Sequence, residues 1–181
     1  SGGLQVGDDL VLTKWAGLEG TAIIAAQKRE KLLETLPEEL VDTAADFYQY
    51  LSVVPEAKIA VETGVSAMHD VTEGGIFGAL WEIGAAADLG ISADLTKIPI
   101  RQETIEVCEV FGINPYQMMS SGSMLIGCAK GNLLVDRLKE AGIPAAVIGR
   151  ATDSNDRVIT NGEEIRFLEP AGSDELYKIY E

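Results

Sequence analysis

The sequence has 181 residues, of which 46% are hydrophobic and 24% charged, values typical of a globular chain that can bury one ordinary core. The formal net charge of −15 argues against a nucleic-acid-binding or anionic-membrane surface, because both need a basic footprint, but a small anionic ligand stays possible. No apolar run is long enough to span a bilayer and no signal peptide is recognisable at Ser1-Gly2-Gly3, so we expect a cytoplasmic protein without membrane partners.

The first third of the chain is predicted to form one strand followed by helices. Alternation predicts a strand over residues 9–15, and a glycine turn then leads into a helix over residues 23–34. Pro37, followed by two acidic residues, begins a helix that is expected to run to residue 52. Pro55 begins another helix, which Gly64 closes as a C′ glycine.

The central stretch begins with a short apolar strand over residues 66–69. It turns through Asp70, Thr72 and the pair Gly74-Gly75, and apolar residues then recur at helical spacing. The first N–H groups of a helix have no backbone partner, and glycine lets a phosphate approach the backbone closely, so the turn predicts an anion site. The alternative is an ordinary helix N-cap within a glycine turn.

The second half of the chain mixes strands and helices and is predicted to end in a hairpin. The expected elements are a strand over residues 91–95, an extended segment over 97–100, a helix over 101–112, a strand over 124–129, a helix over 131–141, a strand over 145–151, a hairpin over 156–168 and a short helix over 173–180. Asn161-Gly162 is the signal of a type I′ hairpin turn. The order predicts an α+β fold, arranged as a three-layer α/β/α domain with a mixed sheet flanked by helices.

A second polar loop, from Ser120 to Ser123, precedes the strand at residue 124. Its hydroxyls are candidate ligand donors, although a plain serine-glycine turn is the simpler interpretation. His69 is the only histidine, and its neighbour Asp70 points to the other face of a strand, so a catalytic triad is not expected. Two cysteines, Cys108 and Cys128, lack metal-ligand spacing and are expected to be buried and reduced. No metal site is predicted.

Several motifs occur in an order that is similar to one known family. They are His69-Asp70-Val71-Thr72-Glu73-Gly74-Gly75, Lys97-Ile98-Pro99-Ile100, Phe111-Gly112-Ile113-Asn114-Pro115 and Ser120-Ser121-Gly122-Ser123-Met124-Leu125-Ile126. Together they resemble the C-terminal domain of the aminoimidazole-ribonucleotide (AIR) synthase superfamily. This superfamily includes AIR synthase, selenophosphate synthetase, thiamine-monophosphate kinase, formylglycinamidine-ribonucleotide synthetase and the hydrogenase-maturation carbamoyl dehydratase, and the last of these branches is the most similar.

The resemblance implies a fold, a cofactor and a set of site residues. It implies that residues 1–181 form one C-terminal domain, and that the N-terminal domain, which would hold most of the Mg²⁺–ATP site and form a homodimer, is absent from this chain. It also implies that Thr72, Gly74, Gly75 and the loop Ser121-Gly122-Ser123 contact a phosphorylated or ATP-activated substrate. Asp70 would orient the turn or help to hold a metal.

The sequence departs from the hydrogenase-maturation branch at two places. Glu73 stands where that branch has Arg, and the chain ends in Lys178-Ile179-Tyr180-Glu181 rather than in a reactive cysteine. The first hypothesis is therefore the C-terminal domain of an ATP-dependent enzyme of this superfamily with an unassigned substrate, inactive alone. The second is a maturation or assembly partner that docks another protein, and a weaker third is a free-standing phosphate-binding module.

Overall fold

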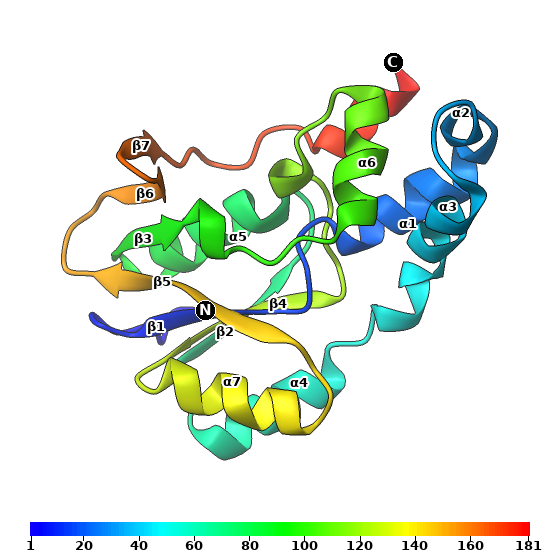
Figure 1. The fold of residues 1–181 in the computed structure, drawn as a ribbon. Coiled ribbons are helices and arrows are strands. Elements are labelled where there is room, and N and C mark those ends of the chain that lie inside the picture. The colour runs from blue at the N-terminus through cyan, green and yellow to red at the C-terminus, as the bar shows by residue number, and fades with distance from the viewer.

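Seven strands form one mixed sheet in the computed structural model, which describes residues 1–181 (Figure 1). The strands are β1 (Asp9–Thr13), β2 (Ala67–Val71), β3 (Gly90–Asp94), β4 (Ser123–Cys128), β5 (Ala145–Thr152), β6 (Arg157–Asn161) and β7 (Glu164–Phe167). Their order across the sheet is β2-β4-β1-β5-β3-β6-β7. All neighbours pair antiparallel except β3 and β6, which are parallel.

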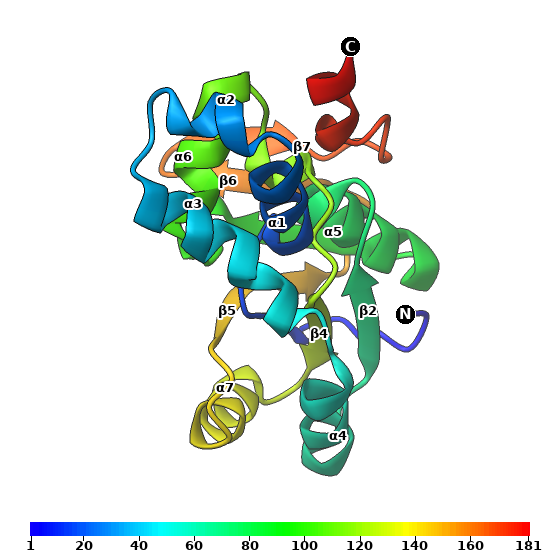
Figure 2. The ribbon, with the colours of Figure 1, turned by 90° about the vertical axis from the view of Figure 1, so that its right-hand side faces the viewer.

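Helices cover both faces of the sheet. The α-helices are α1 (Leu18–Gln27), α2 (Arg29–Leu33), α3 (Glu38–Ala45), α4 (Val54–Thr63), α5 (Gly75–Ala87), α6 (Gln102–Phe111) and α7 (Gly131–Glu140), and the 3-10 helices are η1 (Asp46–Tyr50), η2 (Leu95–Lys97), η3 (Pro115–Gln117) and η4 (Glu175–Tyr180). Helix α5 packs against β2, β3 and β6, whereas α7 packs against β1 and β5 and also contacts α4 (Figures 1 and 2). The predicted three-layer α+β fold with a mixed sheet is confirmed.

Two predicted helices are interrupted in the structure. The helix expected over residues 23–34 starts earlier, as α1, and breaks at Lys28, whose φ and ψ of −116° and 25° are not helical. The break lets Leu32 turn inward, where it joins Ile24 in a buried apolar cluster. The helix expected over residues 37–52 changes to the tighter η1 after Ala45, and Phe47 packs in a separate cluster with Leu18.

The C-terminal hairpin is confirmed, but its predicted turn type is wrong. Asn161 pairs with Glu164, so Gly162 and Glu163 are the two central residues of the turn. A type I′ turn needs a positive φ at both central residues, and only Gly162, at +61°, has one. Glycine at the first central position with a positive φ is the requirement of a type II′ turn. Asn161 is the last residue of β6 instead.

The main apolar core lies between the sheet and α5. It contains 18 buried residues, including Leu80 and Ile83 from α5 and Leu12 and Leu125 from the central strands. These fully buried side chains explain why the helix after the glycine turn is apolar around most of its surface. None of the helices combines the length and the apolar character needed to cross a membrane.

Both cysteines are buried and unpaired, as predicted. Burial, reinforced by the carboxylate of Glu175, raises the pKa of the Cys108 thiol to about 12, and burial also raises the pKa of Cys128. The folded chain therefore keeps the Cys108 proton at a pH at which the unfolded chain loses it. Because the unfolded state then binds fewer protons, this thiol contributes stability below about pH 8.5 that is lost as the pH rises toward 12.

We predict that the Cys108 contribution to the free energy of unfolding falls by about 1.4 kcal/mol per pH unit above pH 9. Urea unfolding of the wild type and of Cys108→Val between about pH 8 and pH 10 measures the difference in slope. Valine retains an apolar side chain without the titrating group, so the variant isolates the thiol. Equal slopes in the two proteins would contradict the prediction.

Candidate functional site

Three loops meet at one end of three neighbouring strands, β2, β4 and β1. Strands β1 and β2 both end there, and β4, which lies antiparallel between them, begins there. The Gly17 N–H donates to Ser120 Oγ at 2.9 Å, and the Ser120 N–H donates to the Thr72 carbonyl at 3.3 Å. The two polar loops that the sequence identified are thus in direct contact, and the N-termini of α1 and α5 flank the segment that leads into β4.

The Gly74-Gly75 pair is needed to start α5 at this point. Both residues have positive φ, +82° and +62°, in the region that side chains disfavour. A Cβ atom on Gly75 would lie 2.5 Å from the carbonyl oxygen of Tyr116 and 2.7 Å from that of Met118. Glycine therefore allows the backbone of the turn to contact the backbone of the loop before β4.

A carboxylate of the chain itself lies at the N-terminus of α5. Asp174 is completely buried, and its Oδ2 accepts a hydrogen bond from the Gly74 N–H at 2.7 Å. Its Oδ1 accepts from the N–H groups of Met119 at 3.0 Å and Leu176 at 2.9 Å. Three main-chain amides from three segments therefore hold one anionic group, an arrangement that helix N-termini favour.

The expectation that the amides of Gly74 and Gly75 are unpaired is wrong. Asp174 takes the first, and the Gly75 N–H donates to the Thr72 carbonyl at 3.2 Å. The physical reason is that a buried N–H without a partner is costly, so the C-terminal segment supplies an acceptor. The anionic group that the structure places at this helix start is a side chain of the chain itself.

The other predicted site residues differ in their exposure. Asp70 lies within β2, not in the turn, because it pairs with Met124 of β4, and its side chain is exposed. Thr72 is also exposed, and its hydroxyl has no protein partner. Thr72 therefore presents a free hydroxyl just before the α5 N-terminus, whereas Asp70 points to the sheet face opposite His69, the β2 residue that contacts α5.

The serine loop is largely occupied with internal contacts. Ser123 is buried, and its hydroxyl donates to the Ser120 carbonyl at 2.8 Å. Gly122 has a φ of +102°, and a Cβ there would lie 2.8 Å from the carbonyl oxygen of Tyr50. Only Ser121 is partly exposed, so it is the member of this loop that can offer a hydroxyl to a ligand.

His69 does not pair with Asp70, as expected from their positions on a strand. Its Nε2 lies 2.8 Å from Glu82 Oε2 on α5, and its Nδ1 lies 2.9 Å from the Ser1 hydroxyl. The pair joins β2 to α5 on either side of the glycine turn. Its effect is to hold the strand and the helix that frame the turn.

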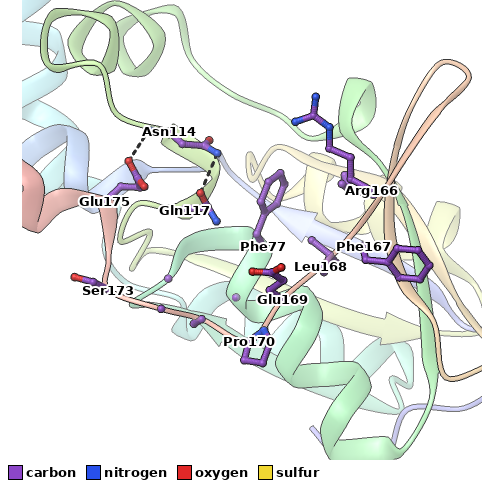
Figure 3. Close-up of a pocket in the computed structure, with 15 residues that line it drawn as sticks. Phe77, Asn114, Gln117, Arg166, Phe167, Leu168, Glu169, Pro170, Ser173 and Glu175 are labelled. Carbon is purple, nitrogen blue, oxygen red and sulfur yellow. Dashed lines mark hydrogen bonds between the residues drawn. The ribbon is translucent and has the colours of Figure 1, made fainter.

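A cavity of about 370 Å³ opens beside the first turn of α5 (Figure 3). Phe77 reaches it from α5, Asn114 and Gln117 from the loop around η3, and Arg166 from β7. The segment that connects β7 to Asp174 closes another side. Phe77 stacks on Tyr116 with ring centroids 5.5 Å apart, a contact that stabilises the position of the Phe77 ring at the cavity.

Charged groups around the site are mostly acidic. Glu73, the residue that departs from the hydrogenase-maturation motif, accepts a hydrogen bond from the Tyr177 hydroxyl at 2.9 Å. This bond favours the protonated phenol and raises the pKa of Tyr177. Arg166 is the cationic side chain at the cavity, and this side chain is 78% exposed. No group of three or more His, Cys, Asp or Glu in the chain could hold a metal ion.

Residues 5–161 match the family model described as AIR synthase related protein, C-terminal domain. The chain belongs to this family. A carbamoyl dehydratase HypE from Rhodobacter capsulatus is 29% identical over 155 residues, which are 83% of this chain and 43% of the relative. HypE from Cupriavidus necator is 32% identical over 127 residues, which are 70% of this chain and 34% of the relative. The chain thus spans less than half the length of these relatives.

Solved structures of family members share the fold. E. coli HypE superposes with a TM-score of 0.79 at 21% identity, over 98% of this chain and 54% of the other. A HypE in complex with ATP gives 0.72 at 17% identity, over 97% of this chain and 54% of the other. AaThiL complexed with AMPPCP and TMP gives 0.67 at 14% identity, over 90% of this chain and 51% of the other.

Sequence reasoning missed Asp174 as a site residue. The local signal was present, because Asp174 caps η4 through its own contact with Leu176, as an aspartate before a helical segment often does. Its contact with Gly74 spans 100 positions of the sequence and depends on how the C-terminal segment packs, so no local pattern encodes it.

Proposed function

We propose that this chain is the C-terminal, substrate-binding domain of an ATP-dependent enzyme of the AIR synthase superfamily, nearest the hydrogenase-maturation branch. The observation that carries the proposal is the exposed Thr72 hydroxyl at an anion-holding helix N-terminus, in a chain that matches this family over residues 5–161. The chain covers about half of the HypE structures that it resembles. The rest of the catalytic machinery would lie in another domain.

The site fits a phosphate group better than it fits a metal. The three amides at this end of α5 are taken by Asp174, so the hydroxyls of the exposed Thr72 and the partly exposed Ser121 are the groups that would bind phosphate oxygens. Bound there, ATP would supply an activated phosphoryl group. The lack of a three-residue metal-ligand group supports placing the Mg²⁺ ligands in the other domain, with Asp70 as at most one contributor.

In this proposal, each residue of the turn has a separate task. The Thr72 hydroxyl donates to a phosphate oxygen, and Ser121 can add a second donor. Gly74 and Gly75 hold the backbone in the conformation that exposes Thr72, and the Gly74 amide could contact phosphate only after Asp174 had left it. Preorganised donors of this kind stabilise the charge that develops in phosphoryl transfer.

Thr72→Ala in the full-length protein is expected to lower ATP-dependent phosphate release by about 10²-fold, the effect of losing one preorganised donor. Thr35→Ala, at an exposed threonine of the α2–α3 connection, is the matched control and should retain wild-type turnover. Equal melting temperatures would show that the loss is not caused by unfolding. If Thr72→Ala turns over as fast as Thr35→Ala, Thr72 has no role in the reaction.

A second candidate function is docking of another maturation or assembly protein. One structure similar to this chain is a HypE–HypF complex, with a TM-score of 0.70 at 18% identity over 93% of this chain and 54% of the other. The Asp174 contact favours this alternative, because it makes the glycine turn a satisfied structural cap. Capture of a specific partner by a full-length protein that shows no affinity for ATP would favour docking over catalysis.

A further inference from the structure

Strand β7 leaves an unpaired edge at one end of the sheet (Figure 1). All four of its residues are exposed, and Ile165 and Phe167 are 65% and 69% exposed, the highest values among the large hydrophobic residues of the chain. An exposed edge strand is a template for pairing with another strand. The family model matches residues 5–161, so β7 lies outside the matched residues.

The register of the hairpin shows which backbone groups face outward. The Leu168 N–H donates to the Arg157 carbonyl at 2.7 Å, and Arg166 pairs with Ile159 two positions further along the ladder. Hydrogen-bonded positions alternate along an antiparallel strand, so residues 164, 166 and 168 direct their backbone groups toward β6. The N–H and C=O groups of Ile165 and Phe167 therefore face away from the sheet.

The side chains of β7 are divided between two faces. Arg166 lies on the α5 side, because it pairs with Ile159 and both residues line the cavity there. Glu164 shares that face, and Arg166 Nη2 lies 3.6 Å from Glu164 Oε2. By the alternation of side chains along the strand, Ile165 and Phe167 point to the opposite face of the sheet, and Phe167 also borders the cavity.

We propose that the β7 edge pairs with the β7 edge of a second copy of this chain. In a two-fold antiparallel pair centred on Ile165, each outward Ile165 would exchange both backbone hydrogen bonds with Ile165 of the partner subunit. Glu164 would then face Arg166 of the partner subunit, and Arg166 would face Glu164 of the partner subunit. Cross-strand pairs of opposite charge stabilise a sheet, and like charges destabilise it.

The same arrangement covers the exposed apolar side chains. Ile165 and Phe167 of both copies would lie together on the face away from α5, and the two sheets would become one continuous sheet. The arrangement also brings Arg166 of the partner subunit to the α5 side, near the rim of the cavity. This pairing is distinct from a homodimer formed through an N-terminal domain.

A four-residue strand buries too little surface for tight association. Interfaces below about 1,200 Å² form weak complexes, so a Kd on the order of 10 µM is expected. Sedimentation velocity of the 181-residue chain from about 2 to about 200 µM brackets this value. The expected result is a monomer at the low end and a dimer at the high end.

Charge exchange tests the register of the pair. Glu164→Arg places arginines opposite each other and is expected to weaken the dimer at least tenfold, as is Arg166→Glu through opposed glutamates. The double variant Glu164→Arg/Arg166→Glu restores both ion pairs and is expected to dimerise within about threefold of the wild type. Because the double variant also restores the ion pair between residues 164 and 166 of one chain, an equimolar mixture of the two single variants is the sharper test: it pairs opposite charges only between chains and is expected to form a heterodimer.

A matched pair of lysine variants tests the edge itself. Ile165→Lys should abolish the dimer, whereas Val61→Lys, at a residue of α4 that is 64% exposed, should leave it unchanged. Circular dichroism of each variant confirms that it is folded. A monomer throughout the concentration range, a dimer that survives Glu164→Arg, or a double variant no stronger than the single ones would each overturn the proposal.

Discussion

Lys14→Met is expected to lower the free energy of unfolding by about 3–5 kcal/mol, the largest effect that we predict. Lys14 and Glu56 are 6% and 1% exposed, and Lys14 Nζ lies 2.8 Å from Glu56 Oε1. The ammonium also donates to the carbonyls of Tyr50 at 2.7 Å and Ser52 at 2.8 Å. Methionine fills the space of the side chain but leaves the Glu56 carboxylate and two carbonyls without their shared donor.

Lys58→Met is the matched control, because Lys58 is exposed on α4 and forms no ion pair, and it should change stability by less than about 0.5 kcal/mol. Urea unfolding of both variants measures the difference. The double variant Lys14→Met/Glu56→Leu should recover much of the lost stability. It also removes the Glu56 carboxylate, which the single variant leaves buried without a cationic partner. A Lys14→Met protein as stable as Lys58→Met would show that the buried pair contributes nothing.

The position of Lys14 explains why this pair matters to the site. Its φ of +54° turns the chain at the end of β1, where side chains rarely adopt such a conformation. The side chain then anchors Tyr50, at the end of η1, and Ser52 beyond it, and a Cβ on Gly122 would lie only 2.8 Å from the Tyr50 carbonyl oxygen. Losing Lys14 should therefore loosen the serine loop as well as lower the overall stability.

Asp174→Ala is expected to cost about 2–4 kcal/mol, because it leaves the N–H groups of Gly74, Met119 and Leu176 without their common acceptor. The carboxylate is also the favourable charge at the N-terminus of α5. The effect should be concentrated at the site. Hydrogen exchange of these three amides should accelerate more than exchange in β4 and β5.

Asp153→Ala provides the comparison, since Asp153 is exposed between β5 and β6 and makes no side-chain hydrogen bond. Its stability should match that of the wild type within about 0.5 kcal/mol. Asp174→Asn should be intermediate, because the amide oxygen can still accept from two N–H groups but carries no charge. Unchanged exchange at Gly74 in Asp174→Ala would mean that another acceptor replaces the carboxylate.

Patterns of neighbouring residues predicted the helices and strands whose formation depends mainly on local sequence. Alternating apolar residues gave the strands, the Asn161-Gly162 step gave the hairpin, and helical spacing after Gly75 gave α5. The sequence did not predict that helices are interrupted at Lys28 and after Ala45. These interruptions depend on the tertiary packing of Leu32 and Phe47, which are buried in two separate clusters. The hairpin turn type was wrong because the strand pairing, not the dipeptide, decides which residues are central.

Of the candidate site, the sequence predicted the glycine turn before α5 but not the distant residues that contact this turn. Glycines at a strand–helix junction indicate an anion-holding helix start, and the structure contains one. The group that occupies it comes from a residue 100 positions later, and the ion pair that supports the serine loop joins residues 42 positions apart, Lys14 and Glu56. Such contacts follow from tertiary packing, which no window of neighbouring residues contains.

The place of β1 in the middle of the sheet has a consequence for how the chain is made. It is the first of these seven strands to be synthesised, yet its neighbours are β4 and β5, with Val11 opposite Ile126 on one side and Val147 on the other. Most of the polypeptide must be synthesised before either neighbour exists, and contacts so distant in sequence slow folding toward the millisecond-to-second range. The segment that carries β1 thus exposes apolar surface until β4 and β5 have been synthesised, which makes it prone to aggregation during translation.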